Sequence, residues 1–189
     1  MNKRLLLILA LAATIPPLTL DARDTFDNPV IAGCHPDPSI CRVGDDFYVV
    51  TSSCAWFPGI PVFHSRDLMH WEQIGYVMDR PSQLPMKDGT GFSNGIWAPT
   101  IRYHKGLFYV SCTAHEAGGN FYVTAENAEG PWSEPVYIDA PGIDGSLFFD
   151  DDGKCWYTGS INGTPEEDRY LHEDRIFIQE LDLSAGKLI

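Results

Sequence analysis

Two aspartates occupy equivalent positions in segments of the sequence that resemble one another. Asp37 and Asp144 each open a short strand-like segment, and the matching position in a further segment is Ala98. Two carboxylates that face one cavity raise each other's proton affinity and can perform general acid–base chemistry. The alternative is that both cap strands or start turns, a role that fits Asp37 before Pro38. Their equivalence in the repeat favours the catalytic interpretation.

The repeated segments indicate how these carboxylates are positioned. Each copy is a strand, a turn rich in Asp and Gly, and an aromatic strand, starting at Asp37, Ala98 and Asp144. No convincing helix pattern occurs between Asp24 and Ile189, and 17 Gly and 14 Pro residues separate short β-branched runs. The sequence therefore predicts an all-β protein built from units typical of β-propeller blades.

The chain is short for a closed propeller. Propellers have roughly four to eight blades, each with four short strands. The 189 residues supply about three such units, and the third has no clear outer strand. We therefore expect the chain to be the N-terminal part of a longer protein.

Aromatic residues accompany the two aspartates. Trp97 directly precedes the repeat position of the second segment, and Trp56 follows the first aromatic strand. Flat aromatic faces suit the C–H faces of sugar rings, so both are predicted to line a pocket. Trp71, Trp132 and Trp156 recur at equivalent blade positions and are predicted to be structural.

Charge and the N-terminal residues restrict partners and location. With 13 basic and 26 acidic residues, a nucleic-acid partner is not expected. A basic start followed by an apolar run over residues 5–15 predicts a signal peptide over residues 1–22, with the domain over residues 23–189. We expect a secreted or periplasmic protein without a membrane span. The lipoprotein-like residues 31–34 lie too far from the apolar run for anchoring to be expected.

The cysteines and acidic runs give no metal signal. The chain has five cysteines without C-x-x-C spacing, so they are predicted to be small buried residues, although a Cys34–Cys41 disulfide stays open. Residues 150–153 are predicted to form a hairpin turn, because Phe148 stands where a calcium loop needs an acid. Acidic residues 166–168 and 173–174 are predicted to be solvated. No metal or cofactor is expected.

One histidine lies beside the first aspartate. His35 stands two residues before Asp37. It could donate to a ligand or hold the base, and no second histidine occurs at metal-ligand spacing. This residue is therefore predicted to assist Asp37 or a ligand.

Several motifs, in order, resemble glycoside hydrolase family 43, most closely its β-xylosidase and α-L-arabinofuranosidase branch. The motifs are NPVIAGCHPDPSI (residues 28–40), WFPG (56–59), HSRDL (64–68), RPSQL (80–84), WAP (97–99) and IDGSLF (143–148). The resemblance covers essentially all of residues 28–189.

The resemblance implies a five-bladed β-propeller that hydrolyses glycosides with inversion of configuration. It assigns Asp37 as general base, Asp144 as the residue that tunes the acid, and Trp97 to the sugar pocket. The general acid of the family is a Glu that would follow Ile189. Cys54 and Ile143 stand where many relatives carry Phe near the substrate, which leaves the sugar preference open.

The expected substrates are oligosaccharides derived from xylan or arabinoxylan, and the 189 residues alone are expected to be inactive. A non-catalytic sugar-binding propeller is the alternative; it would keep Trp97 and Trp56 but would not need Asp37. A structural or partner-binding propeller would have no sugar affinity. Oligomeric state stays open.

Overall fold

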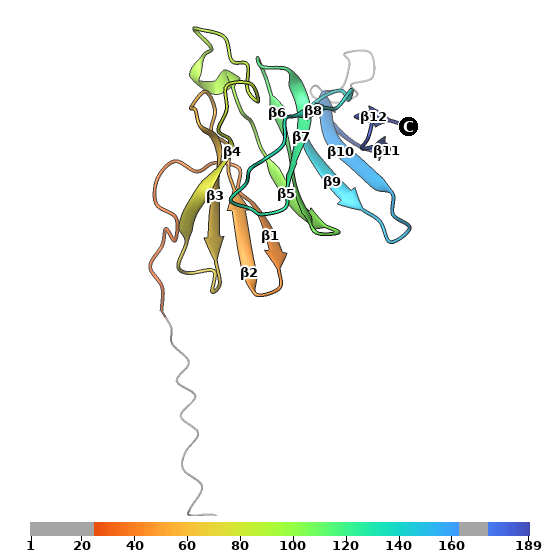
Figure 1. The fold of residues 1–189 in the computed structure, drawn as a ribbon. Helices are drawn as coiled ribbons and strands as arrows, with labels where there is room; N and C mark the ends of the chain where they lie inside the picture. Colours follow the sequence, from red (N-terminus) through yellow and green to blue (C-terminus); the bar gives the residue numbers. More distant parts are fainter. Residues whose placement is uncertain (1–24, 163–173) are drawn as a thin grey trace, which may run out of the picture.

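The computed structural model describes residues 25–162 and 174–189 (Figure 1). These residues form β-strands and a single 3-10 turn at Phe92–Asn94, with no α-helix among them. The all-β prediction is therefore confirmed. The predicted signal peptide and acidic residues 166–168 lie outside the described residues.

Within the described residues the strands form three antiparallel sheets of four strands each. The first contains β1 (Ser39–Val43), β2 (Asp46–Val50), β3 (Gly59–Ser65) and β4 (Glu72–Met78). The second contains β5 (Thr100–His104), β6 (Leu107–Ala114), β7 (Gly119–Ala125) and β8 (Val136–Tyr137). The third contains β9 (Ile143–Phe149), β10 (Cys155–Asn162), β11 (Asp174–Asp182) and β12 (Lys187–Leu188). The sheets follow one another side by side, as Figure 1 shows.

The third sheet has an outer strand that the sequence does not signal. β12 is only two residues long and pairs with the end of β11. A strand of two residues has no detectable alternation, so its existence depends on the neighbouring strand.

The three predicted hairpins are confirmed. Gly44 and Lys105-Gly106 have positive φ angles of 63°, 48° and 86° in the β1–β2 and β5–β6 turns, and Asn or Gly is typical where such angles are required. In the β9–β10 turn the Gly153 amide donates to the Asp150 carbonyl over 3.0 Å. The acidic run at residues 150–152 is thus a hairpin turn, as predicted.

Two apolar clusters hold the sheets together. The first lies between the first and second sheets and includes Val50, Val62 and Ile101, all fully buried. The second joins the second and third sheets through residues such as Tyr122 and Tyr157. Burial of these side chains supplies the main attraction between sheets, because the strand ladders of the described residues each stay within one sheet.

Polar contacts set the register between the inner strands. The Ile101 amide of β5 donates to Ser39 Oγ of β1 over 3.2 Å. Arg102 of β5 donates to the Leu147 carbonyl of β9 over 3.1 Å and to the Ser146 hydroxyl over 2.8 Å. These contacts fix neighbouring blades against sliding, which apolar packing alone would permit.

We predict that Arg102→Met lowers the free energy of unfolding by about 1–3 kcal/mol, because it removes charge-assisted hydrogen bonds between β5 and β9. Chemical denaturation followed by tryptophan fluorescence measures this change. Lys87→Met is the control, since Lys87 is exposed. Equal stability of the two variants would show that the Arg102 contacts do not join the sheets.

Candidate active site

The two predicted catalytic aspartates lie at the starts of inner strands. Asp37 is two residues before β1, and Asp144 is the second residue of β9. β5 lies between these strands: it contacts β1 through Ser39, and its Thr100 hydroxyl lies 3.2 Å from the Gly145 carbonyl. The first residues of the three inner strands are therefore gathered at one end of the molecule, as the repeat predicts.

Both aspartates have an unusual backbone conformation. The φ angles of Asp37 and Asp144 are +54° and +58°, whereas Ala98 at the third equivalent position is not in this region. Non-glycine residues with positive φ are uncommon, and such strain of about 1–3 kcal/mol gathers at functional sites. The repeat position is thus left-handed only where it carries a carboxylate.

A buried serine holds Asp37. The Ser52 hydroxyl donates to Asp37 Oδ2 over 2.5 Å, and the Ser52 amide donates to the Pro36 carbonyl over 3.0 Å. Ser52 lies just after β2 and is only 4% exposed. Two bonds from one rigid position therefore fix both the backbone before Asp37 and its carboxylate.

His35 does not hold Asp37, in contrast to one of the roles that the sequence left open. Its Nε2 atom lies 3.2 Å from the Ala32 carbonyl, and its ring packs edge to face on Phe63 with centroids 4.9 Å apart. The histidine fixes the segment before β1 instead.

The negative charge of Asp37 acts on Asp144. Partial burial and, second, the negative charge of Asp37 raise the pKa of Asp144. Burial also raises the pKa of the Cys112 thiol strongly, and both carboxylates add to that effect. The protonated thiol donates to the Trp97 carbonyl over 2.9 Å. Asp37, Asp144 and Trp97 therefore surround the same part of β6.

The predicted tryptophans are placed differently. Trp97 is half-buried: its Nε1 atom donates to the Ser93 carbonyl over 2.5 Å, and its ring stacks on His115 with centroids 4.2 Å apart. Trp56 is 61% exposed and meets the exposed ring of Phe92 edge to face at 5.9 Å. The structure thus fixes Trp97 firmly and leaves much of Trp56 accessible.

A backbone link joins the loops that carry these tryptophans. Cys54 and Ile96 exchange two hydrogen bonds of 3.0 and 2.8 Å between amides and carbonyls. A Cβ atom on Gly95 would lie only 2.0 Å from the Cys54 carbonyl oxygen, so this approach requires glycine. Cys54 contributes through its backbone, while Ile143 is half-buried and pairs with Ser160 in the ladder.

The cysteines agree only in part with expectation. Cys112 and Cys155 are buried, but the prediction is wrong for Cys34, which is exposed. All five are free, so the Cys34–Cys41 disulfide is absent.

Among residues 25–162 and 174–189 we find no group of three or more His, Cys, Asp or Glu arranged for a metal. The same residues contain no helix long and apolar enough to cross a membrane.

Comparison with known families identifies the fold. The profile of glycosyl hydrolases family 43 matches residues 26–189. The chain belongs to this family. Family 43 enzymes have a β-propeller fold, which confirms the propeller architecture predicted from the repeat.

Similar family 43 proteins carry glycosidase names. A xylosidase/arabinosidase of Butyrivibrio fibrisolvens is 55% identical over 166 residues, which are 86% of this chain and 32% of that protein. A non-reducing end alpha-L-arabinofuranosidase of Bacteroides ovatus is 49% identical over 144 residues, 75% of this chain and 27% of that protein. The structure of a xylan beta-1,4-xylosidase from Bacillus halodurans matches with a TM-score of 0.74 and 42% identity, covering 87% of this chain and 31% of that one. The chain spans about a third of the length of such relatives.

Two residues that hold the candidate site carry no signal in the sequence. Ser52 and Cys112 are common residue types without a motif of their own, and each reaches its partner across at least 15 positions of the chain. The third unit of the repeat offers no equivalent that would signal them. Only the packing of β2 and β6 behind the inner strands reveals their contacts.

We predict that Asp37→Asn lowers the pKa of Asp144, because it removes a nearby negative charge that favours the protonated form. The pKa of Asp144 should stay above its ordinary value, since partial burial is unchanged. Carbon-detected NMR titration of the carboxyl groups measures the shift, with exposed Asp88→Asn as the control. An unchanged Asp144 titration in Asp37→Asn would contradict the coupling.

Proposed function

We propose that the longer protein containing this chain is an inverting glycoside hydrolase acting on xylan- or arabinoxylan-derived oligosaccharides. It removes terminal sugars as a β-xylosidase or an α-L-arabinofuranosidase. The observation that carries this proposal is the pair of aspartates with left-handed backbone, Asp37 and Asp144, at the starts of the inner strands of two blades. Membership of family 43 supports it, as do the names of the relatives.

Asp37 is the general base of the proposed reaction. Ser52 occupies its Oδ2 atom, while Oδ1 has no hydrogen bond within the described residues. This free oxygen accepts a proton from water as the water attacks the anomeric carbon. Inversion places the water on the face opposite the leaving group, and the two catalytic carboxyl groups of such enzymes are about 6.5–9.5 Å apart.

Asp144 supports the general acid in the proposed reaction. Its raised pKa lets it accept a proton more readily than an ordinary aspartate. The acid itself is a Glu supplied by the chain after Ile189. It protonates the leaving oxygen as the glycosidic bond breaks, which balances the proton that Asp37 takes from water.

The sugar lies against aromatic side chains in this proposal. Trp97 provides a fixed wall, and Trp56 with Phe92 provides an exposed aromatic edge. Cys54 and Ile143 reduce the aromatic area relative to many family members.

The complete domain of the proposed enzyme has five blades. Residues 1–22 act as a signal peptide and direct the protein to the periplasm or the exterior.

We predict that the longer protein releases xylose or arabinose from aryl glycosides and that the 189-residue chain does not, because the proposal places the acid after Ile189. Asp37→Asn should reduce kcat of the longer protein by about 10²–10⁴-fold. Steady-state kinetics with both aryl glycosides measures this, and Asp88→Asn is the control. Full activity of Asp37→Asn would exclude Asp37 as the base. Sugar binding by the longer protein without release of either sugar would instead support a non-catalytic sugar-binding propeller.

We predict that Ser52→Ala lowers kcat about tenfold with little change in KM, because it frees the Asp37 carboxylate to rotate. Ser52→Thr keeps a hydroxyl and should recover most of the activity. The matched control is Ser53→Ala, whose hydroxyl accepts from the Ile60 amide instead. Equal kcat/KM–pH profiles and kcat values for Ser52→Ala and the parent would exclude a positioning role.

A further inference from the structure

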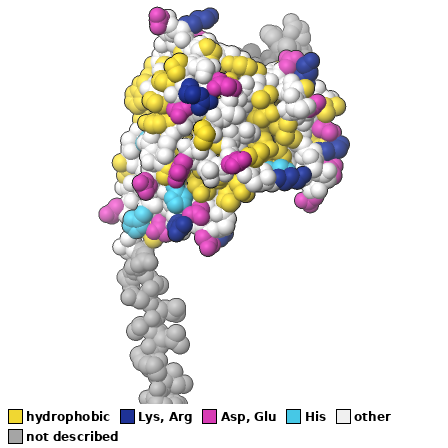
Figure 2. Space-filling model, viewed as in Figure 1, with side chains coloured by type: hydrophobic (Ala, Val, Ile, Leu, Met, Phe, Trp, Pro, Cys, Tyr) yellow, Lys and Arg dark blue, Asp and Glu magenta, His cyan; other side chains and the backbone are white. Residues whose placement is uncertain are grey.

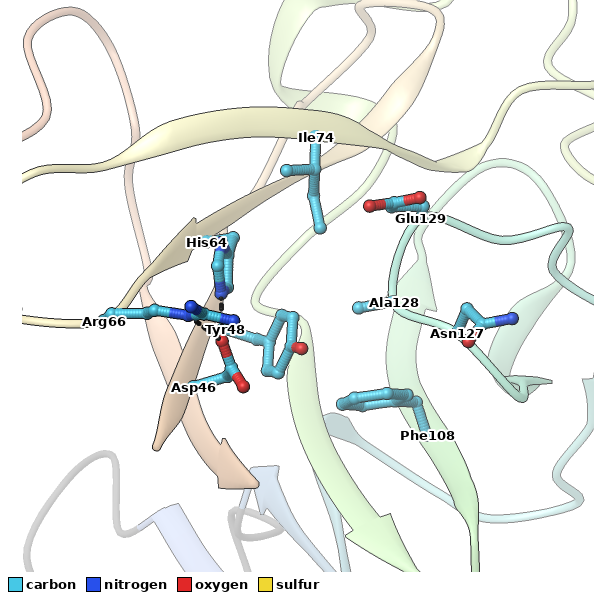
Figure 3. Close-up of a pocket in the computed structure, with 9 residues that line it drawn as sticks. All are labelled: Asp46, Tyr48, His64, Arg66, Ile74, Phe108, Asn127, Ala128 and Glu129. Carbon is cyan, nitrogen blue, oxygen red and sulfur yellow. Dashed lines mark hydrogen bonds and ion pairs between the residues drawn. The ribbon is translucent and has the colours of Figure 1, made fainter. Parts of the chain in front are cut away.

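A cavity lies between the first and second sheets, at the end remote from Asp37 and Asp144, and Figure 3 shows the residues that line it. It encloses about 310 Å³. β1 runs away from Asp37, and the chain returns through a two-residue turn to Asp46, the first residue of β2. A strand of five residues is about 16 Å long. The cavity is therefore separate from the candidate active site.

One wall of the cavity is a fixed carboxylate. Asp46 Oδ1 accepts from His64 Nε2 over 2.7 Å and from Arg66 Nε over 2.9 Å. These bonds, first that of His64 and then that of Arg66, lower the pKa of Asp46, so it stays ionised. Its Oδ2 atom has no hydrogen bond in the described part of the chain and is available to a ligand.

The opposite wall comes from the second sheet. Asn127 and Glu129, in the loop after β7, line the side opposite Asp46. In Figure 3 the Glu129 carboxylate points into the cavity, whereas the amide nitrogen of Asn127 points away from it. Neither side chain has a hydrogen-bonding partner among the described residues. The Tyr48 hydroxyl lies between the walls, also without a partner there, and burial followed by the charges of Asp46 and Glu129 raises its pKa. It therefore remains a donor at neutral pH.

The floor of the cavity is apolar and aromatic. The rings of Tyr48 and Phe108 meet edge to face with centroids 5.0 Å apart, and Ile74 closes one side. In Figure 2 charged side chains of both signs and histidines gather at the lower end of the first sheet, where β2 begins. The cavity thus combines an apolar floor with several free polar groups from two directions.

This combination favours a small polyhydroxylated ring. The ring's C–H face would lie against Tyr48 and Ile74, since Phe108 behind them is only 4% exposed. Its hydroxyls would donate to Asp46 and Glu129 and accept from Tyr48. The two carboxylates disfavour anions such as phosphate. The positive charge that Asp46 attracts is already supplied by Arg66, which weakens the case for an organic cation.

We infer that this cavity binds a pentose residue of the xylan-type substrate, as a second carbohydrate site remote from the site of hydrolysis. The identity of the sugar rests on the proposed function, whereas the cavity's preference for a neutral hydroxylated ring rests on its own side chains. Such a site would keep a long substrate on the enzyme between cleavage events.

NMR titration of the ¹⁵N-labelled 189-residue chain with xylobiose tests the inference. We expect amide shifts at Tyr48, Asn127 and Glu129. Glu129→Gln and Tyr48→Phe should each raise the Kd for xylobiose about tenfold, because each removes one hydrogen bond to a ligand hydroxyl. Glu126→Gln, an exposed neighbour outside this cavity, is the matched control and should leave Kd unchanged.

Several outcomes would overturn the inference. One is the absence of xylobiose shifts at these amides, and another is an unchanged Kd in both cavity variants. Shifts caused by putrescine but not by xylobiose would make this a cation site. Binding is measured without turnover, so the Asp37→Asn variant should bind xylobiose at this cavity like the parent. Xylobiose binding at this cavity without hydrolysis by the longer protein would contradict the proposed function but not this inference.

Discussion

The geometry of the candidate active site depends on a small set of hydrogen bonds to one glycine carbonyl. Among the described residues, the ladders between strands stay within single sheets, and only isolated backbone bridges join one sheet or its loops to the next. Apolar packing alone would therefore let the inner strands slide. The hydroxyls of Thr100 and Ser111 lie 3.2 and 2.9 Å from the Gly145 carbonyl, and they hold β9 against β5 and β6. A Cβ atom on Gly145 would collide with the Tyr157 hydroxyl. Because Asp144 directly precedes Gly145, this contact also sets where its carboxylate lies.

The site therefore combines two kinds of stabilisation with different tasks. Apolar clusters between the sheets supply most of the free energy, but they are tolerant of small shifts. The buried polar contacts of Ser52 and Cys112 are directional, and each engages an element that carries a candidate functional residue. Rigid strands thus present the reactive side chains, while the connecting loops provide the aromatic surface.

The sequence predicted features that are encoded locally and missed those created by packing. Turn residues and alternating apolar residues within short segments predict the hairpins and strands. The repeat of these segments predicts the equivalence of Asp37 and Asp144. Ser52 has no such signature, since its role exists only where the end of β2 meets the start of β1. The residues around Asp46 were equally invisible, because their cavity forms between two sheets. His35 lies near Asp37 in sequence, but its ring packs on Phe63.

The left-handed backbone at Asp37 and Asp144 limits which replacements can report on chemistry alone. Asparagine tolerates this conformation nearly as well as aspartate, whereas alanine and β-branched residues resist it. An alanine at either position would relax the chain and move its neighbours as well as delete the carboxylate. The same restraint ranks the residues that these positions accept. Aspartate, asparagine and glycine adopt the conformation at low cost, whereas bulkier residues, such as Ile60 with a φ of +57° in this structure, adopt it with strain.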